Sequence, residues 1–269
     1  MPSIRVRDIN IYYEIREEGD RLFYISGTGG DLRDSPTFFD ILVANHFRIL
    51  AYDPRGLGQT DKPDKPYTMG DYAEDAKGLL DALGWDSSNV MGLSFGGMVA
   101  QELAIRYPEK VERLVLACTS SGGAGGSSYP LHEIWDLPVR ERVARQLELI
   151  DIRRDKQWQA ANQRRWEALI NNRLASLAAH ASEPRREMGQ RRQLEARKGQ
   201  DTYDRLPQLK TPVFICGGYY DGISPPGNLQ ALKSQIPNAT LEFFQGGHGF
   251  ITDDPNALKR VMLFLRGEI

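Results

Sequence analysis

Ser94 is the residue of this chain whose surroundings most clearly indicate covalent chemistry. It lies within Gly-Leu-Ser-Phe-Gly-Gly (residues 92–97), with an apolar run before it and a helical pattern after it. This pattern is typical of a nucleophile elbow, a strand-to-helix turn that holds a serine in a disfavoured backbone conformation with its hydroxyl accessible. The tight bend requires small residues at Gly92 and Gly96. The same pattern also occurs at unreactive strand–helix junctions, so the rest of the sequence has to decide.

A serine hydroxyl becomes a nucleophile when a base can accept its proton, and histidine is the most frequent base. The chain has four histidines. We expect His46 at the end of a helix, and His132 and His180 in a helical insertion. His248 differs because it lies in a glycine-flanked loop directly after the apolar strand 239–244. A strand-end loop can bring an imidazole to the serine, so His248 is the predicted base; the alternative is a turn histidine without a catalytic role.

A third group has to orient the imidazole and stabilise its charged form. Asp221 follows the apolar strand 212–217, at the edge of the sheet where we also expect the serine. Asp253 and Asp254 are alternatives, but they stand before Pro255 at a helix start, where acidic residues favour the helix dipole. The sequence therefore predicts Asp221 as the partner of the histidine, in the chain order Ser, Asp, His.

A glycine-rich loop at residues 26–31 follows the short apolar strand 22–25. Such a loop could hold a phosphate, but G-x-G-x-x-G is not completed because Leu32 stands where the third glycine would be, so we expect no dinucleotide cofactor. The alternative is a loop whose backbone N–H groups form half of an oxyanion hole. This chemistry needs no metal and no cofactor.

The remaining elements must bring these groups to one edge of a sheet. Residues 4–16 alternate between apolar and polar side chains, which predicts an antiparallel hairpin at a sheet edge. Buried strands and helices then alternate, which predicts a mostly parallel sheet with helices on both faces. The further elements we expect are strands at 47–52, 90–93 and 111–118, and helices at 69–83, 95–107, 228–235 and 256–265.

Asp53 and Arg55 belong to the loop 53–60, which follows a buried strand. Both side chains could take part in catalysis. The favoured interpretation is that they fix the loop through hydrogen bonds and ion pairs, because glycine, proline and charged residues together indicate a tight, structured loop.

The glycine loop, Asp-Pro-Arg-Gly-Leu-Gly-Gln-Thr at 53–60 and Gly-Leu-Ser-Phe-Gly-Gly at 92–97 resemble the motifs of the α/β-hydrolase superfamily, in its order and spacing. The resemblance covers the chain outside residues 122–206. It implies an eight-stranded, mostly parallel sheet with helices on both faces and an inserted helical cap. It also implies an oxyanion hole formed by the backbone N–H groups of Thr28 and Phe95. Many relatives have His-Gly where this chain has Ser26-Gly27, which leaves open how the loop is supported.

Residues 122–206 differ in character from the core that we expect at 1–121 and 207–269. The serine–glycine run 120–128 has a composition typical of a hinge or linker, and helical patterns follow at 140–155 and 156–179 and after Pro184. We interpret this part as a helical cap over the carboxyl ends of the strands, where ligands bind in such sheets. The candidate pocket residues, taken from the loops and from the cap, are Gly27, Leu93, Trp135, Tyr219, Ile223 and Phe250.

The predicted cap is basic, with 16 Lys/Arg and 12 Asp/Glu in residues 122–205. Its arginines could recognise a carboxylate substrate, since a guanidinium binds carboxylates well. The favoured alternative is solvated helix faces with local ion pairs. Trp135, Trp158 and Trp166 are expected to pack the interior of the cap. The arginines considered are Arg153, Arg154, Arg164, Arg165, Arg185, Arg186, Arg191 and Arg192.

The composition limits the classes of protein that the chain can represent. A net charge of −2 gives no electrostatic reason to expect binding to nucleic acid or to an anionic membrane. No run of 18 apolar residues and no signal-like start is present, so we expect a cytoplasmic protein with a small-molecule substrate. The two cysteines, Cys118 and Cys216, end apolar runs and are expected to be buried thiols. The oligomeric state stays open, with a homodimer as one option.

These features together predict a serine hydrolase that cleaves a small to medium carboxylic ester or lactone through an acyl-enzyme on Ser94, similar to esterase and enol-lactonase relatives. A serine at the elbow argues against relatives that use aspartate there, the haloalkane dehalogenases and epoxide hydrolases. Two alternatives share the same three residues: a hydrolase of C–C bonds, of meta-cleavage or β-diketone type, and a small-molecule receptor. A non-catalytic interaction protein is disfavoured because Ser94, Asp221 and His248 are all present.

Overall fold

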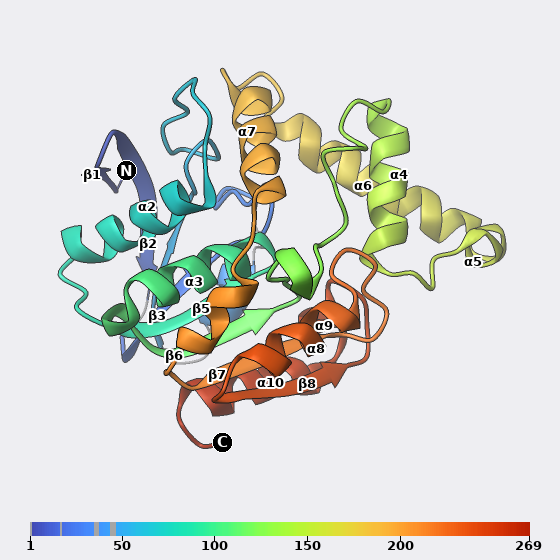
Figure 1. The fold of residues 1–269 in the computed structure, drawn as a ribbon. Helices are drawn as coiled ribbons and strands as arrows, with labels where there is room; N and C mark the ends of the chain where they lie inside the picture. Colours follow the sequence, from blue (N-terminus) through green and yellow to red (C-terminus); the bar gives the residue numbers. More distant parts are fainter. Residues whose placement is uncertain (1, 17, 35–37, 44–46) are drawn as a thin grey trace.

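We analysed a computed structural model, which describes residues 2–16, 18–34, 38–43 and 47–269; His46 lies outside these ranges. The described residues form one eight-stranded sheet in the order β1-β2-β4-β3-β5-β6-β7-β8 (Figure 1). The hairpin expected near the N-terminus is confirmed, because β2 pairs antiparallel with β1 and β4, whereas all other neighbours are parallel. The strands are β1 (Ser3–Val6), β2 (Ile9–Arg16), β3 (Asp20–Ile25), β4 (Phe47–Tyr52), β5 (Ser88–Leu93), β6 (Val111–Ala117), β7 (Val213–Gly218) and β8 (Ala239–Phe244).

Helices cover both faces of the sheet. Successive side chains of a strand point to opposite faces, so Val90 of β5 packs with one set of helices and Met91 with the other. Helices α2, α3 and α8 pack on the first face, and α1, α9 and α10 pack on the second. The helices are α1 (Phe38–Val43), α2 (Met69–Ala82), α3 (Phe95–Arg106), α4 (Val139–Ile150), α5 (Lys156–Ala161), α6 (Gln163–Ala179), α7 (Arg186–Lys198), α8 (Pro226–Gln235), α9 (Phe250–Asp253) and α10 (Pro255–Leu265).

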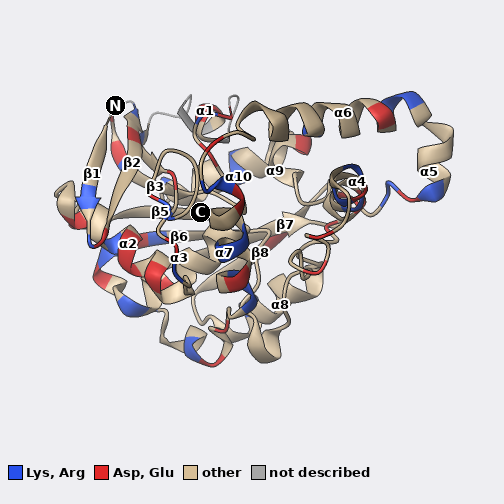
Figure 2. Cartoon of the chain, turned by 90° about the horizontal axis from the view of Figure 1, so that it is seen from above, with Lys and Arg blue, Asp and Glu red and all other residues tan. Residues whose placement is uncertain are grey.

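Four helices, α4 to α7, stand between β6 and β7 in the chain and lie beyond the carboxyl ends of the parallel strands (Figure 1). We call them the cap helices. Helices α4, α5 and α6 extend to one side, whereas α7 stands directly over the sheet. Figure 2, which views the chain from above, also places α7 over the core and α5 at the far end of the projection. The loops after β3, β5, β6, β7 and β8 all emerge beneath this layer.

Two helix predictions for this region need correction. The single helix expected at 156–179 is divided into α5 and α6, because Asn162 leaves the helical conformation and its N–H and side chain both donate to the carbonyl oxygen of Trp158. Helix α4 ends at Ile150 rather than at Asp155, because Asp151 is extended. The carbonyl groups that the helix leaves free at its end are used in tertiary contacts with the site described below.

Both ends of the serine–glycine run 120–128 are packed, which corrects its interpretation as a flexible linker. Ser120 and Ser121 are fully buried, and the Ser120 and Ser128 hydroxyl groups lie 2.8 Å apart. A Cβ atom at Gly122 would lie 1.8 Å from the carbonyl oxygen of Gln200. The glycines therefore allow close approach of two backbone segments here. None of the described helices is long and apolar enough to span a membrane.

Candidate active site

Ser94 joins β5 to α3 in a strained turn. Its φ of 54° and ψ of −114° lie in a region that residues with a side chain rarely adopt. The conformation is held by two hydrogen bonds, from Ser94 N to the carbonyl oxygen of Ala117 at 2.8 Å and from the Thr119 hydroxyl to the carbonyl oxygen of Ser94 at 2.7 Å. Cβ atoms at Gly92 and Gly96 would lie 2.4 Å and 2.0 Å from backbone oxygens. The structure therefore confirms why the turn requires glycine on both sides of the serine.

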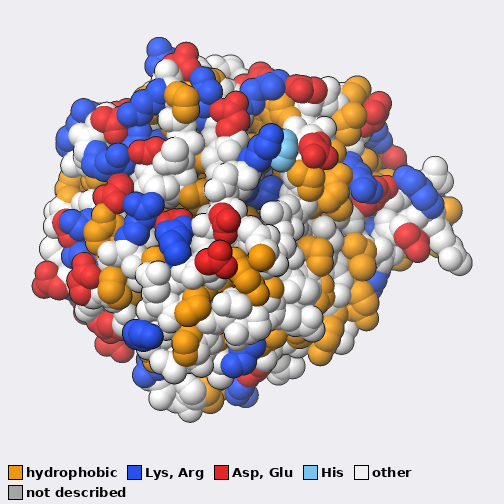
Figure 3. Space-filling view, viewed as in Figure 1, with side chains coloured by type: hydrophobic (Ala, Val, Ile, Leu, Met, Phe, Trp, Pro, Cys, Tyr) orange, Lys and Arg blue, Asp and Glu red, His pale blue; other side chains and the backbone are white. Residues whose placement is uncertain are grey.

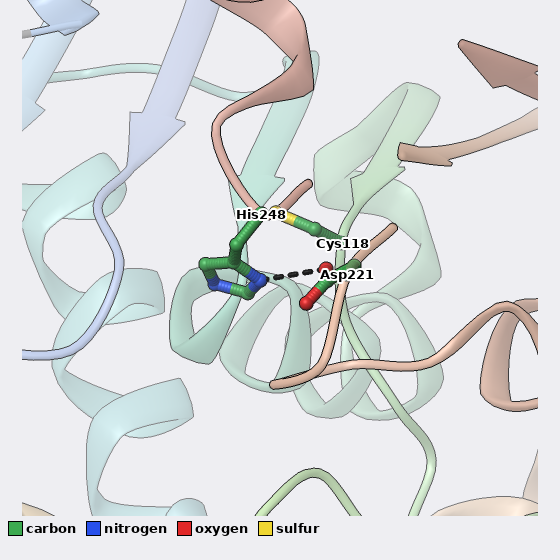
Figure 4. Close-up of side chains that lie close together, drawn as sticks. All are labelled: Cys118, Asp221 and His248. Atoms are coloured by element: carbon green, nitrogen blue, oxygen red, sulfur yellow. Dashed lines mark hydrogen bonds and ion pairs between the residues drawn. The ribbon is translucent and has the colours of Figure 1, made fainter. Parts of the chain in front are cut away.

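Ser94, His248 and Asp221 form a hydrogen-bonded relay. His248 Nε2 lies 2.9 Å from Ser94 Oγ, and His248 Nδ1 lies 2.7 Å from Asp221 Oδ2. Figure 4 shows the imidazole turned toward the carboxylate, with the two side chains coming from the loops after β8 and β7. Ser94 is 8% exposed and Asp221 2% exposed, whereas the side chain of His248 is 16% exposed. The structure thus brings together the three side chains that the sequence pointed to.

The carboxylate of Asp221 is held by its own loop. Its second oxygen, Oδ1, accepts hydrogen bonds from the backbone N–H groups of Ile223 at 2.8 Å and Ser224 at 2.9 Å. These two hydrogen bonds fix the carboxylate through Oδ1, while Oδ2 faces the imidazole of His248. The rival Asp254 instead caps α10 by accepting from Asn256 N at 2.9 Å, the helix-start role expected for it.

The end of α4 anchors both loops of the relay. The backbone N–H of His248 donates to the carbonyl oxygen of Ile150 at 2.6 Å, and Gly222 N donates to that of Leu149 at 2.9 Å. The last carbonyl groups of a helix have no partner within the helix. Here they position the segments that carry the base and its carboxylate. Sequence reasoning missed this contact, because backbone groups carry no residue-type signal.

The glycine loop after β3 passes over the serine. A Cβ atom at Gly27 would lie 3.5 Å from Ser94 Cβ. The N–H of Phe95, in the first turn of α3, has no acceptor within the helix, and no described residue accepts from the N–H of Thr28. Both N–H groups therefore have no acceptor among the described residues, as the predicted oxyanion hole requires.

The glycine loop has Ser26-Gly27 where many relatives have His-Gly, and other residues support it. Ser26 Oγ is buried and has no partner among the described residues. The loop is instead held by Leu32 N, which donates to Asp53 Oδ1 at 2.8 Å, and by Gly29 N, which donates to Gln193 Oε1 of α7 at 2.9 Å. A cap helix thus takes part in fixing the loop.

Comparison with known proteins agrees with this geometry. A family model described as "alpha/beta hydrolase fold" matches residues 21–255. The chain belongs to the α/β-hydrolase family. A poly(3-hydroxyalkanoate) depolymerase from Ectopseudomonas oleovorans is 29% identical over 92% of this chain and 84% of its own length. A 2-hydroxymuconate semialdehyde hydrolase from Pseudomonas putida is 31% identical over 86% of this chain and 81% of its own length.

Solved structures support the same fold. The enol-lactonase from Burkholderia xenovorans LB400 superimposes with a TM-score of 0.78 at 20% identity, covering 99% of this chain and all of its own. An identity this low supports the fold and leaves the substrate open. With relatives that are named hydrolases over most of its length, this α/β-hydrolase family member is a hydrolase.

Asp53 and Arg55 of this α/β hydrolase have structural roles. The carboxylate of Asp53 accepts from the backbone N–H groups of Leu32 and Gln59, both at 2.8 Å. Burial raises its pKa to about 6, although these two donors oppose the shift. Arg55 is fully buried and pairs with Asp75. The favoured interpretation, that the two residues fix the loop, is confirmed.

Cys118 lies beside the relay. Its sulfur and ligand atoms of Asp221 and His248 all lie within 4.8 Å of one another (Figure 4). Burial, and then the charge of Asp221, raises the pKa of the Cys118 thiol well above its usual value. A protonated thiol is a poor metal ligand, and the carboxylate already accepts hydrogen bonds on both oxygens. The arrangement therefore suits the relay better than a metal centre.

The predicted pocket residues divide into two groups. Gly27 and Leu93 flank the serine, and Ile223 packs with the half-buried Trp135 in an apolar cluster beneath the cap helices. Tyr219 and Phe250 need correction. Tyr219 is half exposed and packs against Phe243 on the outside of β8, and Phe250 is fully buried against Phe244 in the core. Phe250 therefore has no exposed surface with which to line a pocket, and the ring of Tyr219 contacts those of Tyr220 and Phe243.

The arginines singled out in the cap are mostly solvated or paired. Arg153 pairs with Asp151, and Arg191 with Asp136. Figure 3 shows basic side chains interspersed with acidic ones across one face of the molecule. Trp166 is buried with Val143, as expected for the interior of the cap. Sequence reasoning missed Gln193 and Arg197, both buried on α7; their four-residue spacing on one helix face was the available signal.

Proposed function

We propose that this hydrolase cleaves carboxylic esters or lactones of small to medium size through an acyl-enzyme on Ser94. The single observation that carries the proposal is the relay, with 2.9 Å between His248 Nε2 and Ser94 Oγ and 2.7 Å between His248 Nδ1 and Asp221 Oδ2. These distances allow direct proton transfer between the hydroxyl and the imidazole.

In the first half-reaction Ser94 Oγ attacks the carbonyl carbon, and its proton passes to His248 Nε2. Asp221 holds the imidazole through Nδ1–H and stabilises the imidazolium. The carbonyl oxygen becomes an oxyanion and accepts hydrogen bonds from the N–H groups of Phe95 and Thr28. When the tetrahedral intermediate collapses, the bond to the leaving oxygen breaks, and that oxygen takes the proton from His248.

In the second half-reaction water replaces the alcohol. His248 accepts a proton from the water, whose oxygen attacks the acyl carbon, and the collapse of the second intermediate returns the proton to Ser94 Oγ. The relay is then restored. We further propose that residues 122–206 act as a cap that closes over the bound substrate, because α4 contacts both loops of the relay and α7 contacts the glycine loop.

Labelling with a fluorophosphonate tests the nucleophile. We expect covalent labelling of the full chain and none of Ser94→Ala, while Ser234→Ala, at an exposed serine of α8, labels normally. A panel of p-nitrophenyl esters and lactones then defines the reaction. Labelling that persists in Ser94→Ala would contradict the assignment.

A C–C bond hydrolase is the second candidate. It is favoured by the 31% identity with a 2-hydroxymuconate semialdehyde hydrolase. Both reactions use the same relay, so the structure of the site does not separate them. A β-diketone or a meta-cleavage product in the same substrate panel does: turnover of these compounds with ester hydrolysis at least tenfold slower would favour C–C cleavage.

A further inference from the structure

Arg197 is a buried arginine that has no acidic partner among the described residues. It lies near the C-terminal end of α7 and is 6% exposed. Its Nη1 donates to the carbonyl oxygen of Tyr129 at 2.9 Å, but Nε and Nη2 are buried and have no acceptor among the described residues. Burial lowers the pKa of Arg197 to about 10, which still leaves it charged at neutral pH. A buried cation with free donors is unfavourable unless something supplies the missing acceptor.

Arg197 lines a cavity of about 360 Å³ between α7 and the segment that follows β6. Met98 of α3 and Ser120 form part of its wall. Glu133 also lines it but is exposed, and no ion pair joins it to Arg197 in the described parts of the chain. The cavity therefore combines a charged donor in its wall with space for a ligand group.

Met98, which lines the cavity, and Arg197 each lie one helical turn from a residue of the site. Met98 lies one turn after Ser94 on α3, and its N–H lies 3.3 Å from the carbonyl oxygen of Ser94. Gln193 lies one turn before Arg197 on α7 and accepts from Gly29 N of the glycine loop. One helical turn spans ~5 Å. A substrate that reaches both groups would therefore carry its second group at the end of an acyl chain that extends from the reacting carbonyl.

We propose that Arg197 binds a carboxylate of the substrate, so that the enzyme acts on esters or lactones whose acyl part ends in a second carboxylate. Nε and Nη2 are adjacent donors on one edge of the guanidinium, and this edge matches the two oxygens of a carboxylate. The inference rests on the proposed function, because it places the second carboxylate relative to the carbonyl that Ser94 attacks. Arg197 is not one of the arginines that the sequence singled out.

A pair of matched substrates tests this selectivity. Mono-p-nitrophenyl glutarate carries the carboxylate, and its methyl ester is the neutral counterpart. For Arg197→Met we expect kcat/KM on the charged substrate to fall ~100-fold, mainly through KM, because one partner of a charge-assisted pair is removed. The neutral substrate should change by less than ~3-fold. Arg191→Met, the same substitution at an exposed arginine of α7, should leave both substrates unchanged.

Binding of glutarate provides a readout that does not depend on catalysis. Calorimetric titration of the full chain should show binding that is lost in Arg197→Met and weakened in Arg197→Lys, which keeps the charge but not the paired donors. Circular dichroism melting of each variant shows that it is folded, and Arg197→Lys carries the test if Arg197→Met does not fold.

Three outcomes are distinguishable. Equal losses on both substrates, or unchanged glutarate binding by Arg197→Met, would overturn the role of Arg197. Turnover of the neutral ester without preference for the charged one would also overturn it, while the proposed function stands. Absence of fluorophosphonate labelling and of all ester turnover would overturn the proposed function, and glutarate binding would still decide whether Arg197 holds a carboxylate.

Discussion

The relay and the inner face of α7 border the same site, but their polar atoms are satisfied differently. In the relay, both oxygens of Asp221 and both nitrogens of His248 have partners within the chain. On α7, Gln193 Nε2 and two nitrogens of Arg197 are buried without a partner among the described residues. In the relay, the folded chain itself supplies a hydrogen-bond partner for each of these atoms. In the second region the described residues supply no acceptor for these donors, and we propose that a ligand does.

The two buried arginines show the same contrast. Arg55 is fully buried and hydrogen-bonds to the carboxylates of Asp75 and Asp8. Those carboxylates raise its pKa against the effect of burial. For Arg197, burial acts unopposed and lowers the pKa. A buried arginine is therefore informative about ligands only when its donors are traced to their acceptors.

The largest expected effect tests whether the relay is self-contained. Ser94→Ala should lower kcat on a neutral ester by about 10⁶-fold, and Asp221→Asn by about 10⁴-fold, because the first removes the nucleophile and the second favours the wrong imidazole tautomer. Steady-state kinetics on p-nitrophenyl butyrate measure both, with Ser234→Ala as the matched control. Activity within tenfold of the unmodified chain in either variant would show that the relay is not the catalytic unit.

The next test compares how much each of the two buried arginines contributes to the free energy of unfolding. Arg55→Met should lower the free energy of unfolding by about 3–5 kcal/mol, because it leaves Asp75 buried beside an incomplete set of donors. Arg197→Met should change it by less than about 1 kcal/mol or increase it, since no carboxylate loses its partner. Urea unfolding followed by tryptophan fluorescence measures both values. If Arg197→Met lowers the free energy of unfolding as much as Arg55→Met does, Arg197 is a structural residue. The two buried arginines would then not differ in role.

A third test concerns the ion pairs that join the glycine loop to the cap. Burial would raise the pKa of Asp31, but hydrogen bonds from Arg33 and Arg186 outweigh it and lower the pKa from 3.8 to about 2. Because the folded-state pKa is the lower one, the stabilisation is present above about pH 4 and is lost as the pH falls toward 2.

The stabilisation that the ionised Asp31 supplies is at most about 2.5 kcal/mol, given the shift in its pKa. Asp31→Asn should therefore flatten the fall in unfolding free energy between pH 4 and pH 2, measured by urea titration at each pH. Asp64→Asn, at an exposed carboxylate that also contacts a cap arginine, should leave the slope as it was. An unchanged slope in Asp31→Asn would show that other carboxylates dominate this range.

The smallest expected effect tests whether Gln193 positions the glycine loop or binds substrate. Gln193→Leu removes the acceptor of Gly29 N and should lower kcat about tenfold on charged and neutral esters alike, because the glycine loop loses a hydrogen bond that fixes it. Gln193→Glu keeps the acceptor and should restore most of kcat. A change confined to KM, without rescue by Gln193→Glu, would assign Gln193 to substrate binding instead of to positioning.

The elements nearest the chemistry were the most predictable. The turn at Ser94 needs glycine on both sides, and His248 is the histidine with glycines around it after a strand, so both could be read from local sequence. The single helix expected at 156–179 was wrong, because its break depends on one residue, Asn162, that a helix could also have accommodated. Phe250 is buried in the core and Tyr219 packs against Phe243, because the packing of a side chain in or after a loop depends on neighbours that are distant in the sequence.

The sequence by itself determined the sheet, the strained serine and the carboxylate–histidine pair, because each depends on residue types at short spacing or on the order of strands. Only the tertiary structure decided that α4 holds the loops of the relay through backbone carbonyl groups, and that Arg197 is buried without a carboxylate. These facts depend on which atoms meet across distant segments. The sequence does not distinguish an arginine whose donors are buried from one whose donors are solvated.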